Sequence, residues 1–144
     1  MPSPDDPDVG VRQVVPLLAI RSMDASLRFY VDGLGFRMTN QWIHEGKLEW
    51  CWLQHGDGAL MLQEVVPPAK YARELEGKAG LGMSLNFMCR DALAFYRAVT
   101  GRGIAAKRPF VGNRMWVTSL KDPDGYDLHF ESATDVPEQT EYES

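Results

Sequence analysis

A short pattern occurs twice in this chain, and it constrains the fold more than any other sequence feature. The pair Phe29-Tyr30 precedes Gly35 and the pair Phe95-Tyr96 precedes Gly101, with the glycine five residues beyond the tyrosine in both copies. Each copy lies in a helix-like segment that follows one apolar run and precedes others. Internal similarity of this kind indicates a repeated structural unit. We therefore predict one strand–helix–three-strand unit used twice.

Hydrophobic periodicity assigns the elements of the first unit. Residues 14–20 form an apolar run interrupted only by Pro16, which predicts a buried strand. Residues 22–34 have helical spacing, with Ser22 as the N-cap and Gly35 as the stop. Turn-forming residues then separate three predicted strands, at residues 36–44, 48–55 and 59–66.

The second unit repeats this order. A strand at 83–89 and a helix at 91–100 are followed by short strands at 104–107 and 115–120 and a last strand at 126–131. The turn before that last strand is Asp122-Pro123-Asp124-Gly125, in which proline presets φ and glycine tolerates a positive φ. Residues 67–82 join the units and hold at most a short helix around 71–75. Two one-sided sheets that meet edge to edge would enclose a shared cavity.

The chain length of 144 residues fits one domain. We place that domain at residues 12–132, with modules at about 12–66 and 82–132. Residues 1–11 are rich in proline and aspartate and are expected to be disordered, and residues 133–144 form an acidic C-terminal tail that is also low in apolar residues.

Charge and cysteine content exclude several classes of protein. The net charge of −5 argues against a nucleic-acid partner, because such proteins need clustered lysine and arginine. No apolar run is long enough for a transmembrane helix, and the N-terminus lacks the pattern of a signal peptide. Cys51 and Cys89 have no metal-binding or redox spacing and are expected to be free thiols in the cytoplasm.

Two segments resemble a known family. Residues 15–36, which contain Met-Asp-Ala-Ser-Leu-Arg-Phe-Tyr-Val-Asp-Gly-Leu-Gly-Phe, resemble the opening module of the vicinal oxygen chelate superfamily. The motif Asp122-Pro123-Asp124-Gly125-Tyr126, followed by Leu128-His129-Phe130-Glu131, resembles its last turn and strand. The resemblance covers about residues 12–132 and implies an α+β fold of two βαβββ modules that form a half-open mixed β-barrel around a cavity. It is closest to the bleomycin-resistance-like branch of this glyoxalase, bleomycin resistance protein and dioxygenase superfamily.

The resemblance also identifies where metal-dependent members hold their ion. The four corresponding positions here are Val15, Met61, Ser84 and His129, of which only His129 is a normal ligand. A divalent ion prefers several converging imidazole and carboxylate groups, so we expect no metal cofactor. His129 remains a candidate catalytic residue, although the resemblance implies that the bleomycin-resistance branch can carry histidine there without a metal.

Alternation along the strands predicts the lining of the cavity, since residues two apart share a face. Trp50, Trp52 and Gln54 share one face, as do Met61 and Gln63. Met38, Asn40, Trp42 and His44 are predicted to share another, whereas residues 114–119 leave open which alternate set points inward. Tryptophan and methionine mixed with polar side chains favour a ligand cavity over a plain core. The predicted ligand-binding residues are Trp42, Trp50, Trp52, Met61, Gln63, Ser84, Asn86, Met88, Trp116 and His129.

Three functions are compatible with these features. The first is a metal-free binding protein for an aromatic or cationic, antibiotic-like small molecule, for which the resemblance implies a homodimer. The second is a lyase, isomerase or oxygenase of the same superfamily, including metal-free acid–base chemistry through His129 with Glu64. The third is a partner-binding domain that uses exposed tryptophans.

Overall fold

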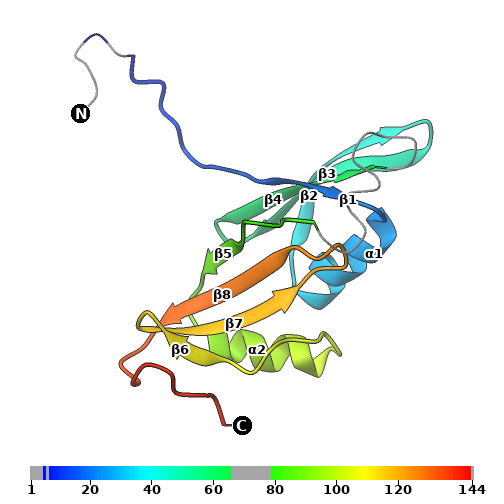
Figure 1. Cartoon of the computed structure of the whole chain (residues 1–144). Helices are drawn as coiled ribbons and strands as arrows, with labels where there is room; N and C mark the ends of the chain where they lie inside the picture. The colour runs from blue at the N-terminus through cyan, green and yellow to red at the C-terminus, as the bar shows by residue number, and fades with distance from the viewer. Residues whose placement is uncertain (1–4, 6, 66–78, 144) are drawn as a thin grey trace.

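The computed structural model describes residues 5, 7–65 and 79–143 and contains two modules of the same design (Figure 1). The first module consists of β1 (Leu17–Ile20), α1 (Met23–Leu27), the π-helical segment η1 (Arg28–Gly33), β2 (Arg37–His44), β3 (Lys47–His55) and β4 (Gly58–Glu64). The second consists of β5 (Leu85–Met88), α2 (Ala92–Gly101), β6 (Phe110–Gly112), β7 (Met115–Lys121) and β8 (Asp127–Ala133). The predicted repeat is thus confirmed.

Each module forms its own four-stranded mixed sheet. The strand orders are β1-β4-β3-β2 and β5-β8-β7-β6, so the first strand of each module pairs with its last. These two pairs, β1 with β4 and β5 with β8, are parallel, and the other pairs are antiparallel. The sheets are not closed into a barrel, which agrees with the predicted α+β, half-open arrangement.

Side-chain caps begin both helices. Ser22 accepts a hydrogen bond from the backbone N–H of Ala25 at 3.2 Å, and Asp91 accepts one from Ala94 at 2.9 Å. Such caps satisfy an N–H group that has no partner inside the helix. The predicted helix at 22–34 is divided into α1 and η1, and Gly35 follows it with a φ of +89°. The glycine stop therefore lies where the sequence indicates.

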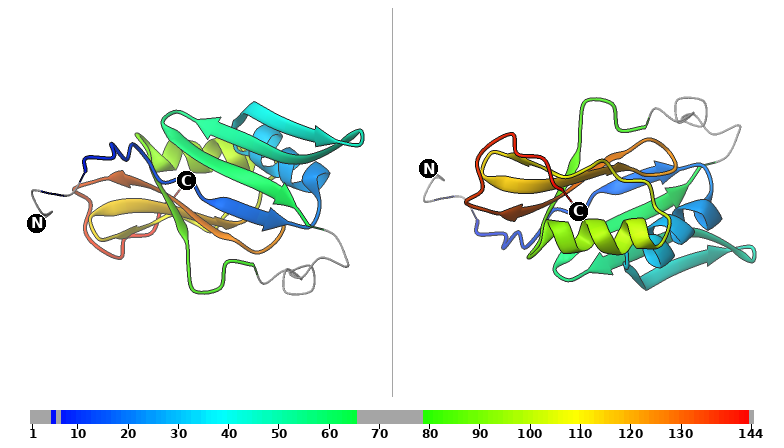
Figure 2. Two further views of the ribbon diagram at one scale, coloured as in Figure 1. Left: turned by 90° about the horizontal axis from the view of Figure 1, so that it is seen from above. Right: turned by 90° about the horizontal axis from the view of Figure 1, so that it is seen from below.

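One hydrophobic core joins the helix-covered faces of the two sheets. Tyr30 and Phe36 of the first module belong to the same buried cluster as Leu128 and Phe130 of the second. Phe36 also contacts Phe87 edge to face, with ring centroids 5.7 Å apart. Figure 2 shows α2 behind the sheet in the view from above and in front of it in the view from below. The opposite face of each sheet lies outside this core.

One expectation for the second module is wrong. Residues 104–107 form no strand. A single backbone hydrogen bond, from Lys107 N to Ser119 O at 2.9 Å, joins this segment to β7, and one such bond does not make a ladder. The strand begins after Pro109 instead, as β6. The C-terminal segment also packs against its own sheet, since Val111 donates to Thr140 O and accepts from Gln139 N, both at 2.9 Å.

Two further regions lie outside the sheets. Residues 7–16 contain no helix or strand, and Figure 1 shows this segment leading away from the two modules. The predicted short helix around 71–75 lies outside the described residues.

Within the part of the chain that the structure describes, no helix is long and apolar enough to cross a membrane.

Candidate functional site

The uncovered face of the first sheet carries three tryptophans. Trp52 lies opposite Met61 on β4 and opposite Asn40 on β2. Trp50 lies opposite Gln63 and opposite Trp42, whose side chain is 51% exposed. Paired residues share a face of a sheet, so these side chains form two adjacent rows. Their strand neighbours, which are fully buried, point to the core: Cys51, Leu53, Leu60 and Leu62.

Glutamine side chains hold this surface in place. Gln54 accepts a hydrogen bond from Trp52 Nε1 at 2.8 Å and donates to Gly56 O at 2.9 Å. Gln63 donates to Glu49 O at 3.2 Å. Because the indole N–H of Trp52 is already bonded, this ring offers a ligand its apolar face. Among the described residues no group donates to the amide oxygen of Gln63, which leaves it as an acceptor beside Trp50.

A β-bulge changes the prediction for β2. Met38 lies opposite the buried Leu53 and packs against the core, whereas Asn40 lies opposite Trp52 on the uncovered face. The register shifts between Met38 and Asn40. One extra residue moves the side chains that follow it to the other face, and this applies here up to Trp42, after which the register shifts again. The prediction that Met38 shares a face with Asn40 and Trp42 was therefore wrong.

The uncovered face of the second sheet is more polar. Asn86, His129 and Ser119 lie opposite one another on β5, β8 and β7. Ser119 Oγ is 2.7 Å from His129 Nδ1, and Asn86 donates to Ser84 Oγ at 3.0 Å. In the next row Met88, which is 61% exposed, lies opposite Glu131. The structure thus gathers Ser84, Asn86, Met88 and His129 on one side of this sheet.

Trp116 lies on the other side of the second sheet. It is opposite Ser132, whose hydroxyl accepts a hydrogen bond from Ala92 N at the start of α2 at 2.8 Å. Its ring also meets Tyr142 edge to face at 6.2 Å. Trp116 is therefore on the helix-covered side, away from His129. This settles the orientation of β7, in which Ser119 and Val117 take the uncovered face.

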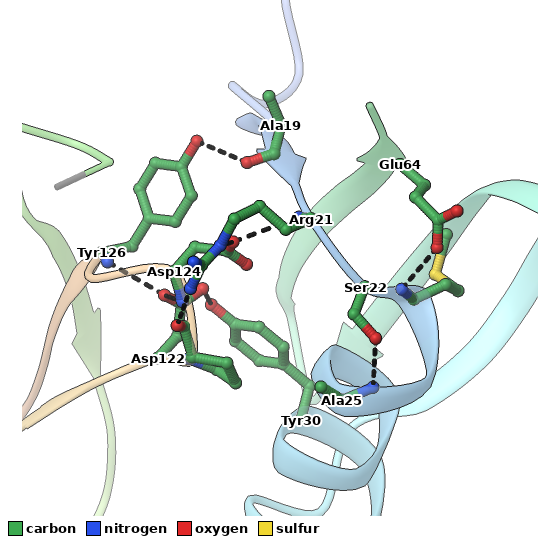
Figure 3. A network of polar contacts seen from close by, with 11 residues as sticks. Ala19, Arg21, Ser22, Ala25, Tyr30, Glu64, Asp122, Asp124 and Tyr126 are labelled. Atoms are coloured by element: carbon green, nitrogen blue, oxygen red, sulfur yellow. Dashed lines mark hydrogen bonds and ion pairs between the residues drawn. The ribbon is translucent and has the colours of Figure 1, made fainter. Parts of the chain in front are cut away.

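The turn before β8 connects the two modules through a buried polar network (Figure 3). Tyr30 Oη donates to Asp122 Oδ2 at 2.8 Å, and Asp122 Oδ1 accepts the backbone N–H groups of Asp124 and Tyr126, both at 2.9 Å. Asp124 in turn binds Arg21 Nε at 2.9 Å. The sequence analysis recognised this turn but missed its role in holding the modules together.

Burial gives Asp122 a testable pH dependence. Desolvation raises the pKa of its carboxyl above the usual value, although hydrogen bonds from Tyr30 and the turn backbone oppose the rise. The native state then binds this proton more tightly than the unfolded state, so the resulting stabilisation is present at acidic pH. It is lost as pH rises through the folded-state pKa.

We expect Asp122→Asn to remove this dependence. Urea unfolding between pH 4 and pH 7 should show the wild type losing stability relative to the variant as pH rises. A constant difference across this range would contradict the assignment.

The sequence matches a known protein family over most of its length. Residues 11–130 match the family model of the Glyoxalase/Bleomycin resistance protein/Dioxygenase superfamily. The chain belongs to this superfamily. No curated protein matches the chain. Among solved structures, a bleomycin-binding protein in complex with bleomycin is 24% identical, with a TM-score of 0.65 over 85% of this chain and 98% of that one.

Two other solved structures have the same superfamily fold. An antibiotic-binding protein from Streptomyces sp. CB03234 is 19% identical, with a TM-score of 0.64 over 85% of this chain and 98% of that one. A glyoxylase/bleomycin resistance protein/dioxygenase domain from Frankia sp. EAN1pec is 16% identical, with a TM-score of 0.67 over 88% and 96%. At these identities the similarity shows the fold alone.

The residues at the superfamily's metal positions do not fit a divalent ion. Val15 offers no donor, Met61 a thioether, Ser84 a hydroxyl and His129 one imidazole. Among the described residues, no group of three or more His, Cys, Asp or Glu side chains could hold a metal. Glu64, considered above as a partner of His129, instead accepts the N–H of Met23 at 2.7 Å and pairs with Lys47.

Proposed function

We propose that this chain is a metal-free binding protein for a small, antibiotic-like organic molecule. The observation that carries the proposal is the uncovered face of the first sheet, where Trp42, Trp50 and Trp52 stand beside Met61 and Gln63. Aromatic rings bind planar groups and cations through their faces. The names of two structural neighbours, a bleomycin-binding protein and an antibiotic-binding protein, support this choice among the functions of the superfamily.

We further propose that the protein acts as a cytoplasmic homodimer. Within the described residues of one chain, no layer covers the tryptophan-bearing face, so a second subunit would complete a cavity that removes most of a ligand from water. Cys51 and Cys89 form no disulfide. Free thiols of this kind fit a reducing compartment.

Thermal unfolding of the full chain tests the proposal. The compounds are bleomycin and a panel of aromatic or cationic molecules, compared with divalent transition metals and with EDTA. A ligand at 100 times its dissociation constant adds about 2.7 kcal/mol of stability. We expect stabilisation by at least one organic compound and no change with metals or EDTA. Stabilisation by a transition metal that EDTA reverses would contradict the proposal and favour a metal-dependent enzyme.

A further inference from the structure

A pocket beside His129 combines apolar walls with several hydrogen-bond donors. Its volume is about 270 Å³, and it lies where β7, β8 and the segment before β6 meet. Ala105, Ala106 and Leu120 supply the apolar lining. The polar lining comes from Lys107, Ser119, Lys121, Asp127 and His129. A pocket of this composition holds the polar end of a small organic molecule against an apolar wall.

The Ser119–His129 contact leaves a donor available to a ligand. When the Ser119 hydroxyl donates to Nδ1, the imidazole is neutral and carries its proton on Nε2. When Nδ1–H donates to Ser119, the hydroxyl proton is left to bond elsewhere. No described residue is a hydrogen-bond partner of Nε2. Each arrangement therefore leaves one donor, either Nε2–H or the Ser119 hydroxyl, that an acceptor in the pocket can bind.

Positive charge dominates the same pocket. Lys121 Nζ is 2.8 Å from Asp127 Oδ1, so these two charges offset each other. Lys107 has no ion-pair partner among the described residues, which leaves the pocket with one net positive charge in a chain whose net charge is −5. The pKa of Asp127 lies below its usual value chiefly because Lys121 donates a hydrogen bond to it, and the electrostatic interactions of Asp127 with Lys121, His129 and Lys107 lower it further. Glu131, the next acid on this face of β8, does not line the pocket.

We infer that this pocket binds the carboxylate of a small organic acid, with the apolar part of the molecule against Ala105, Ala106 and Leu120. Lys107 supplies the charge, and the Ser119–His129 pair supplies a directed hydrogen bond. The inference rests on the proposed function, because it takes the ligand to be a small organic molecule, and it adds that this ligand is acidic. An acidic ligand differs from the cationic class named among the possible ligands above.

Two probes of the same shape test this inference on the full chain, 2-naphthoate and its uncharged amide, 2-naphthamide. Amide chemical shifts in NMR titrations report where each probe binds and give its dissociation constant. We expect naphthoate to bind more tightly than naphthamide and to shift Ser119, Lys121 and His129. Lys107→Gln should weaken naphthoate binding about 5- to 10-fold and leave naphthamide binding unchanged. Arg108→Gln removes the same charge from an exposed neighbour outside the pocket and serves as the matched control.

Several results would overturn the inference. These are equal affinity for the two probes, equal effects of Lys107→Gln and Arg108→Gln, and naphthoate shifts confined to the first sheet. Tryptophan fluorescence, measured independently of the NMR shifts, reports binding near Trp50 and Trp52. If both probes bind there and neither shifts His129, the acid pocket is wrong while the proposed function stands. If naphthoate shifts His129 and no compound of the wider panel affects the tryptophans, the proposed function fails instead.

Discussion

Asp122→Ala is expected to lower the free energy of unfolding by about 3–5 kcal/mol, because it leaves three donors without an acceptor and each buried unpaired group costs about 1–3 kcal/mol. Those donors are Tyr30 Oη and the backbone N–H groups of Asp124 and Tyr126. Asp122 and Tyr30 are both buried at the junction of the two modules. Urea unfolding followed by circular dichroism measures the loss, and the change should affect both modules together.

Asp127→Ala is the matched control for this change. Asp127 belongs to the same hairpin, but its ion-pair partner Lys121 is exposed and the Asp127 side chain itself is 44% exposed. Exposed ion pairs contribute about 0–1 kcal/mol. If Asp122→Ala destabilises the protein no more than Asp127→Ala does, the polar network does not hold the modules together.

Trp50→Leu combined with Trp52→Leu is expected to weaken binding of an aromatic ligand about 10- to 100-fold, because an aromatic contact contributes about 0.5–1.5 kcal/mol beyond the area it buries. Both rings lie on the uncovered face of the first sheet and leave the buried core intact. Isothermal titration with the compound found by thermal unfolding measures the loss. Stability without ligand should change little, since neither residue belongs to the core cluster.

Trp116→Leu provides the control for that pair. It removes the same type of side chain from the helix-covered face of the second sheet, where Trp116 contacts Tyr142. We expect it to lower stability and to leave affinity unchanged. Equal loss of affinity in the Trp116 variant and in the double variant would show that the tryptophans act through folding and not through contact with the ligand.

The fold was predictable because its local signals agree with one another. Ser22 and Asp91 precede helices as caps, and Gly35 ends the first helical segment with a positive φ, as the repeat suggested. The strand at 104–107 was predicted from its apolar residues alone. An extended segment becomes a strand only when a neighbouring strand pairs with it. Here all three residues of 110–112 pair with β7, in place of residues 104–107. Pairing between distant segments is not encoded in one segment's composition.

The candidate site was predictable only where side chains alternate between the two faces of a strand without a bulge. Trp50, Trp52, Met61 and Gln63 follow strict alternation and share a face, whereas the bulge in β2 moved Met38 to the core. The partner of His129 was not predicted, because the alternation of residues 114–119 does not show which set points inward. The register of the hairpin decides it, since Leu120 pairs with Leu128 and Ser119 with His129. The Tyr30–Asp122 contact joins residues 92 positions apart, and no local pattern indicates it.

The C-terminal segment has a consequence for how this protein behaves at high concentration. An edge strand with unpaired backbone groups is a template on which another chain can add a strand, and this is a common start of aggregation. Both backbone groups of Val111, in the centre of the three-residue β6, are bonded to Gln139 and Thr140. The tail thereby closes one margin of the second sheet to intermolecular pairing. A segment whose composition suggests no structural role thus covers the backbone edge of β6.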